Sequence, residues 1–172
     1  MVQERENNGR APSTNFCIVD AQSVKNSDTA QSKGYDAGKK VSGIKRHIAV
    51  DTQGLPHAIV VTTADVNDRN GALLMLLLNG ETLSGVRNVL VDGAYTGERF
   101  ERLVHQILGA TVEVVKRNEL RRFAVIPKRW IVERSFAWLE KCRRLWKNCE
   151  RKLHTSEQFV VLAFLALLLR RY

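Results

Sequence analysis

The sequence predicts an α/β fold in which a mixed β-sheet is flanked by α-helices. Three short β-rich runs come first along the chain, and strand-like and helix-like segments alternate after them. Successive strands favour antiparallel pairing, whereas alternating strands and helices favour parallel pairing with helices on the faces of the sheet. With 172 residues and 44% hydrophobic composition, the chain can form one domain with a sizeable core.

The individual elements follow from periodicity and turn chemistry. Residues 1–15 are polar and aperiodic, which predicts a flexible arm ahead of a single domain over residues 16–172. Strands are expected in residues 15–24, in a hairpin over 45–65, in 86–97 where the strand runs into a glycine loop, and in 111–117. Helices are expected in residues 67–80, in 97–109, from Pro127 to about Lys152, and in a last segment capped by Thr155. This order of elements is that of the ribonuclease-H-like fold.

The basic residues are concentrated in one segment. The formal net charge of the chain is +9, and residues 116–152 hold 13 Lys and Arg against 4 Asp and Glu, so this segment carries the whole excess. Such a concentration favours a polyanionic partner, most often nucleic acid. The alternative is a solvated helix face with no partner.

Cysteine usage and hydropathy exclude several classes of protein. Cys17, Cys142 and Cys149 have no metal-ligand spacing, so they are interpreted as reduced core residues of a cytoplasmic protein without zinc. The longest apolar run, residues 159–169, has 11 residues, about half of what a membrane span needs. It is interpreted as a buried C-terminal helix.

Two aspartates end apolar strands. Asp20 ends FCIVD, and Asp92 ends VLVD just before a glycine. A charge at the end of a buried strand is costly unless it is compensated, and ligands bind at such strand ends. The alternative is a capping or turn aspartate. That interpretation suits Asp51, in the turn VDTQG, and also Asp65 and Asp68, which are expected to cap the following helix.

Glu133 lies in the apolar stretch RWIVERSFAWL. On a helical wheel the apolar stripe lies opposite Glu133, whereas Arg129 and Arg144 fall within about 40° of it. One interpretation is a surface i, i+4 pair with Arg129. The other is that Glu133 converges with Asp20 and Asp92. Three such carboxylates would repel unless they held divalent cations, and an oxygen-only site suits Mg²⁺ or Mn²⁺. Two such ions can support phosphodiester cleavage.

Several motifs resemble those of DDE-type bacterial insertion-sequence transposases, and of the insertion-sequence-five family in particular. The motifs are CIVDAQSVK, GYDAGKKVSGIKRHIAVDTQGL, VDGAYTG and VIPKRWIVERSFAWLEKCRRLWKNCERK, and the similarity covers nearly all of residues 16–172. The resemblance implies a ribonuclease-H-like catalytic domain with Asp20, Asp92 and Glu133 as its catalytic and metal-binding triad. Arg129 fits the arginine of a tyrosine–arginine–glutamate–lysine signature, whereas Ile126 and Glu140 depart from it.

The resemblance also implies partners. These are transposon terminal inverted repeats, target DNA and a second copy of the chain in an active homodimer, in the bacterial cytoplasm at the nucleoid. The basic residues expected to contact DNA phosphates are Arg129, Arg143, Arg144, Lys147, Lys39, Lys40, Lys45 and Arg46. Family members carry an N-terminal DNA-binding part, so this chain is expected to be a second-frame or truncated product. The alternatives are a non-transposing DNA-binding remnant and a general ribonuclease-H-like nuclease.

Overall fold

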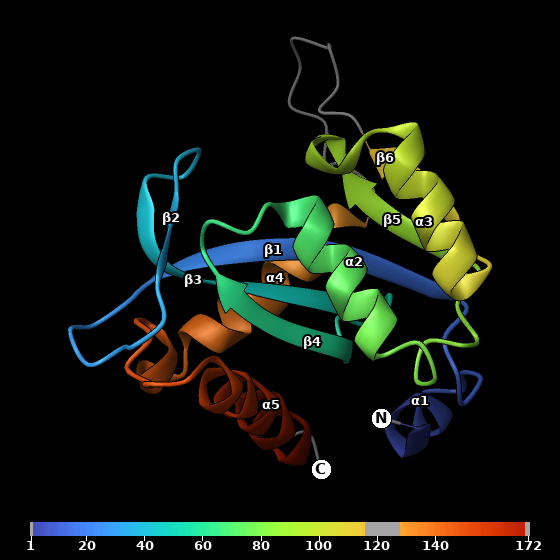
Figure 1. The fold of residues 1–172 in the computed structure, drawn as a ribbon. Helices are drawn as coiled ribbons and strands as arrows, with labels where there is room; N and C mark the ends of the chain where they lie inside the picture. Colours follow the sequence, from blue (N-terminus) through green and yellow to red (C-terminus); the bar gives the residue numbers. More distant parts are fainter. Residues whose placement is uncertain (1, 116–127, 171–172) are drawn as a thin grey trace, which may run out of the picture.

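The computed structural model describes residues 2–115 and 128–170, and it confirms a mixed β-sheet with helices on both faces (Figure 1). The strands are β1 Phe16–Lys25, β2 Gly34–Asp36, β3 Val41–Val50, β4 Pro56–Thr63, β5 Asn88–Asp92 and β6 Thr111–Val115. The helices are α1 Val2–Asn7, α2 Asp68–Leu78, α3 Glu98–Leu108, α4 Arg129–Glu140 and α5 Leu153–Leu169, with 3₁₀ turns η1 Gly93–Tyr95 and η2 Arg143–Leu145. The end of the strand expected over 111–117, and Ile126, lie outside the described residues.

Strand β1 is at the centre of the sheet. It pairs antiparallel with β3 on one side and parallel with β5 on the other, and β6 extends the parallel part. β4 pairs antiparallel with β3 at the opposite edge, and the short β2 pairs with the beginning of β3. The two longest strands, β1 and β3, are rich in β-branched residues, which favour extended backbone. The sheet therefore has the antiparallel and parallel halves that the sequence predicts.

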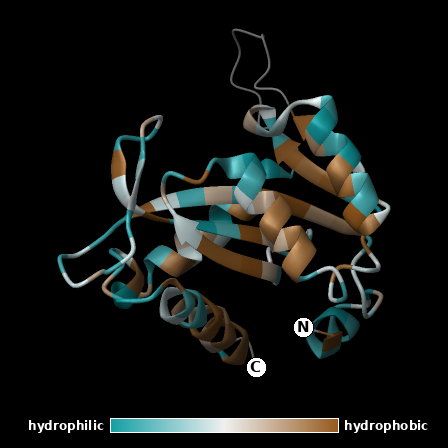
Figure 2. Cartoon of the chain, in the orientation of Figure 1, coloured by the Kyte–Doolittle hydropathy of each residue, from teal (hydrophilic) through white to brown (hydrophobic). Residues whose placement is uncertain are grey.

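Side chains of β1 alternate between two cores. Cys17 and Val19 pack in the core formed with α2 and α3, whereas Ile18 packs in the core formed with α4 and α5. Figure 2 shows apolar residues along the strands of the sheet and along much of α2 and α5. Because side chains alternate along a strand, Asp20 projects to the same side of the sheet as Ile18, the side that α4 covers.

The long helix expected up to Lys152 is interrupted. α4 ends at Glu140, and the chain continues through η2 and an irregular stretch before α5 begins. Asn148 explains the break, because its backbone N–H donates to Lys25 O at the end of β1 and its side-chain amide donates to the side-chain oxygen of Asn26. These bonds are incompatible with a continuous helix. As a result Cys149 is exposed, which corrects the core interpretation, and Cys142 is only half-buried.

Two expected helix caps also differ. Asn67, not Asp65 or Asp68, caps α2, and its side chain accepts from Asn70 N at 2.8 Å. Thr155 lies inside α5, which begins after Lys152 without a side-chain cap. α5 corrects the expectation of a buried C-terminal helix, because Leu162, Leu165 and Leu169 are exposed. Within the described parts of the chain, no helix is long and apolar enough to cross a membrane.

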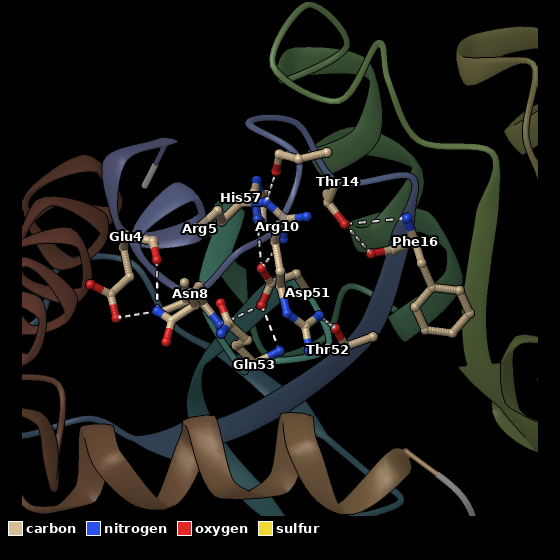
Figure 3. A network of polar contacts seen from close by, with 12 residues as sticks. Glu4, Arg5, Asn8, Arg10, Thr14, Phe16, Asp51, Thr52, Gln53 and His57 are labelled. Carbon is tan, nitrogen blue, oxygen red and sulfur yellow. Dashed lines mark hydrogen bonds and ion pairs between the residues drawn. The ribbon is translucent and has the colours of Figure 1, made fainter.

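The N-terminal segment is folded onto the domain, which differs from the flexible arm expected over residues 1–15. Arg5, on α1, is only 5% exposed and forms an ion pair with Asp51, which is fully buried in the turn between β3 and β4 (Figure 3). Arg5 Nε also donates to Ala11 O at 2.8 Å, which folds the following segment back on the helix. The sequence could not reveal this because the partner is distant along the chain. The division of the chain at residue 15 stays a prediction.

The turn interpretation of Asp51 agrees with the structure. Asp51 Oδ1 accepts from Gln53 N at 2.8 Å and from Leu55 N at 3.1 Å, the pattern of an Asx turn. Burial alone would raise the pKa of this carboxyl, but bonds from His57 and from the turn N–H groups hold it below its usual value.

Candidate active site

Asp20 and Asp92 lie on neighbouring strands. Asp92 is the last residue of β5, whereas Asp20 lies in the middle of β1 rather than at a strand end. The parallel ladder between β1 and β5 ends at the pair Ile18 and Leu90, two residues before the aspartates. Both aspartates line one small pocket together with Arg129. The neighbouring strands proposed for these residues are therefore present.

The environment of Asp20 disfavours its charged form. Burial raises the pKa of Asp20 to about 6; the Ala21 N–H, which donates to Oδ1 at 2.7 Å, opposes this shift, and the nearby charge of Asp92 adds to it. Two carboxylates in one small pocket repel when both are ionised. The pair therefore favours a bound cation or a bound proton.

Asp92 combines a structural and a candidate functional contact. Its Oδ1 accepts from Ala94 N at 2.8 Å and so caps η1, which agrees with the capping alternative. Its Oδ2 lies 3.2 Å from Arg129 Nη2 on α4. One oxygen thus fixes the rotamer while the other faces the site.

Glu133 is linked to Asp92 through Arg129. Arg129 Nε lies 3.3 Å from Glu133 Oε1, so the i, i+4 pair expected as the surface alternative is present. The same guanidinium contacts Asp92, however, so this pair belongs to a chain of charges that runs from α4 to β5. The Glu133 side chain is 58% exposed and is open to solvent and ligands.

α4 is held at a fixed rotation beside the sheet. Ser135 Oγ donates to Gly54 O at 2.9 Å, and Arg134 Nη2 donates to Gln53 O at 2.8 Å, so the helix is bonded to the turn between β3 and β4. The Arg134 guanidinium also stacks on Trp130 and Trp138, with its carbon 4.6 and 4.9 Å from the two ring centres. Glu133 therefore faces the strand ends on a rigid support.

Tyr95, in VDGAYTG, is a site residue that sequence reasoning missed. Its side chain is fully buried, and its hydroxyl has no hydrogen-bond partner among the described residues. Burial raises the pKa of Tyr95 well above its usual value, and the charges of Asp20, Asp68 and Asp92 add to this. The hydroxyl thus stays protonated beside the carboxylates. An aromatic residue three positions after a strand-ending aspartate is the signal that could have identified it.

The donor set fits Mg²⁺ or Mn²⁺. Asp20 is a half-buried carboxyl in one pocket with a second carboxylate, and Glu133 offers a third hard oxygen ligand from α4. Within residues 2–115 and 128–170, however, no three His, Cys, Asp or Glu side chains are already grouped as a metal site. Arg129 explains this, because it lies between Asp92 and Glu133.

Two of the eight basic residues expected at the DNA are inside the fold, which corrects those assignments. Lys45 is 4% exposed, and its Nζ lies 3.1 Å from Asp36 Oδ2 and 2.8 Å from Asp68 Oδ1. Arg46 is 2% exposed, and its Nη2 donates to Leu145 O at 2.9 Å. Both residues belong to β3, which carries them into the core. Lys45 has two carboxylate partners there, whereas Arg46 is held by a backbone carbonyl.

The other basic residues lie at the surface in two groups. Arg143 and Lys147 are exposed just after α4, whereas Arg144, also exposed, is paired with Glu150 at 2.8 Å. Lys39 and Lys40 lie between β2 and β3, and Lys39 Nζ donates to Ala21 O at 3.0 Å, directly beside Asp20. An open groove continues from Lys39 towards the beginning of α2 and Ala94, next to Asp92.

Comparison with known proteins gives consistent results. A family model described as the transposase DDE domain matches residues 11–169. A Burkholderia cepacia protein described as a transposase for insertion sequence element IS402 is 33% identical over 127 residues, which is 70% of this chain and 60% of that protein. A Brucella ovis protein described as a transposase for insertion sequence element IS6501 is 32% identical over 132 residues, 73% of this chain and 98% of that protein.

The fold also has a counterpart among solved structures. The catalytic core domain of BIV integrase superposes with a TM-score of 0.52 over 90% of this chain and 84% of that chain. The two sequences are only 16% identical, so this likeness concerns the fold alone. It places the mixed sheet among ribonuclease-H-like folds, as the order of elements predicts.

Proposed function

Because the chain belongs to the family of DDE transposase domains, we propose that it cleaves transposon ends and transfers the 3′-hydroxyl to target DNA. The observation that supports the proposal is that Asp20, Asp92 and Arg129 line one pocket and that Arg129 also contacts Glu133. The family implies a phosphoryl-transfer enzyme, for which such carboxylates are candidate metal ligands.

Each side chain has a distinct role in this reaction. Asp20, Asp92 and Glu133 would hold Mg²⁺ or Mn²⁺, which when bound acts as a Lewis acid that activates the attacking oxygen and stabilises the leaving one. Lys39, beside Asp20, would hold the scissile phosphate or its neighbour.

The specific insertion-sequence family, the DNA partner, the oligomeric state and the cellular location are also proposed. The motif VIPKRWIVERSFAWLEKCRRLWKNCERK supports membership of the insertion-sequence-five family, with inverted repeats as the DNA, a homodimer as the active form, and a bacterial cytoplasmic location at the nucleoid. A second candidate is a non-transposing DNA-binding remnant. Assaying the chain alone and fused to any upstream reading frame, on the inverted repeats that flank its gene, separates the two.

Removal of divalent metal is expected to abolish cleavage. Asp20, Asp92 and Glu133 offer only carboxylate oxygens, which suit Mg²⁺ and Mn²⁺. Chelation followed by dialysis should stop cleavage of an inverted-repeat duplex, and Mg²⁺ or Mn²⁺ should restore it. Cleavage that persists after exhaustive chelation would exclude this type of site.

DNA affinity is expected to fall steeply with salt. Neutralising one phosphate contact changes the log–log slope by about 0.9, so the double variant Arg143→Gln/Lys147→Gln should bind more weakly with a slope smaller by roughly 2. Fluorescence anisotropy with a labelled duplex measures both quantities. Arg102→Gln is the control, because Arg102 is exposed on α3, across the sheet from α4, and should keep its slope. Equal slopes in all three proteins would contradict the assignment.

A further inference from the structure

Arg129 occupies the space between two candidate metal ligands. Its Nη2 lies 3.2 Å from Asp92 Oδ2 and its Nε lies 3.3 Å from Glu133 Oε1, and its side chain is only 19% exposed. The two contacts differ in quality. Nε has no hydrogen-bond partner among the described residues, so its contact with Glu133 is an ion pair without hydrogen-bond geometry. The guanidinium therefore serves as a counter-ion that binds Glu133 loosely.

A cation coordinated by Asp92 and Glu133 would need the oxygens that Arg129 now contacts. A guanidinium held there would also repel a divalent ion, because like charges a few ångströms apart in a partly buried site are only partly screened by water. A phosphate group offers Arg129 another partner, since guanidinium groups bind phosphate oxygens in bidentate fashion. The carboxylates and a DNA phosphate therefore compete for the single positive charge of Arg129.

We propose that Arg129 is a positioning residue. In the free protein its guanidinium occupies the position between Asp92 and Glu133 that a divalent cation would take. When a DNA phosphate binds the guanidinium, Arg129 leaves this position and the cation can bind there. The inference rests on the proposed function, since it needs a metal at the carboxylates and DNA beside them. By linkage, DNA and the divalent cation then bind cooperatively, and each raises the affinity for the other by the same factor.

The test measures Mn²⁺ affinity by calorimetry, without DNA and without any activity readout. Arg129→Gln is expected to bind Mn²⁺ on the order of tenfold more tightly than the unchanged protein, because the competing charge is removed. Arg102→Gln should match the unchanged protein. In the same series, Arg129→Gln should melt at a lower temperature than the unchanged protein without metal, and it should gain more from added Mn²⁺.

A second arm adds a short duplex at low salt. DNA should raise the Mn²⁺ affinity of the unchanged protein several-fold, whereas Arg129→Gln should show little further gain. Equal or weaker Mn²⁺ binding by Arg129→Gln would overturn the inference while leaving the metal site intact. Absence of Mn²⁺ binding in every protein would instead remove the metal from the proposed function, and the inference with it. If Arg129→Gln does not fold, Arg129→Lys, which cannot bridge both carboxylates, decides the question: an unchanged affinity overturns the inference.

Discussion

Replacing any one of Asp20, Asp92 and Glu133 by its amide is expected to lower DNA cleavage on the order of 10⁴-fold, nearly as far as replacing all three. The reason is that the carboxylates act as a unit, and groups that act together show strongly non-additive losses. Loss of one ligand displaces a cation and with it the alignment of the attacking and leaving oxygens. Cleavage of an inverted-repeat duplex, followed on a gel over a long time course, measures the effect.

Binding and folding should survive these changes. Phosphate contacts come from other side chains, so each amide variant should retain its DNA affinity or gain some as negative charge is removed. Asp28→Asn is the matched control, since Asp28 is exposed after the end of β1 and lines a different pocket from Asp20 and Asp92. Normal cleavage by Glu133→Gln in a protein that is otherwise active would show that the triad is wrongly assigned.

Breaking the buried ion pair between Arg5 and Asp51 is expected to be the most destabilising single change. Asp51→Asn leaves Arg5 buried without a counter-charge, and removing one partner of a buried pair costs about 3–5 kcal/mol of unfolding free energy. Urea denaturation measures this, with Asp28→Asn again as the control. Replacing both residues by apolar ones of similar volume should recover part of the loss. Unchanged stability of Asp51→Asn would contradict the buried pair.

The same pair makes a signed prediction for pH. The pKa of Asp51 is lowered in the folded state from its ordinary 3.8, so its contribution to stability is present above about pH 4. It is lost as the pH falls through the lower, folded-state pKa. Unfolding free energy measured from pH 6 downwards should therefore fall less steeply in Asp51→Asn than in the unchanged protein. Equal slopes would mean that Asp51 titrates as it does in the unfolded chain.

The expected loss of stability makes Asp51→Asn unsuitable as a control for the triad. The sequence marks it as a turn aspartate, and the structure agrees, but an amide at Asp51 removes far more than a turn contact. A loss of cleavage in that variant has to be compared with its loss of stability before it says anything about catalysis.

Local patterns predicted the elements of the sheet and could not predict contacts between distant segments. β1 and β5 were recognisable because their apolar runs end at turn residues, and the exposure of Glu133 followed from helical spacing alone. The helix expected to continue to Lys152 ends at Glu140 because Asn148 binds the end of β1. No property of residues 141–152 themselves indicates that partner.

The burial and the partners of charged side chains were the least predictable properties from the sequence. Lys45 and Arg46 belong to a basic, glycine-bearing stretch typical of a surface, yet both follow β3 into the interior. Lys45 forms ion pairs there with Asp36 and Asp68, which come from segments before and after it along the chain. Likewise Arg129 was recognisable as the i, i+4 partner of Glu133, whereas its contact with Asp92 depends on how α4 packs against β5.

The turn between β3 and β4 gives the three carboxylates unequal mechanical freedom. Asp20 and Asp92 belong to strands in the interior of the sheet, which can move only if the hydrogen-bonded ladder moves with them. Glu133 is carried by α4, which is bonded to that turn through Gln53 O and Gly54 O, and the turn in turn holds Arg5 of α1. The support of Glu133 therefore reaches through the turn to the N-terminal helix, whereas the support of the aspartates is the sheet itself.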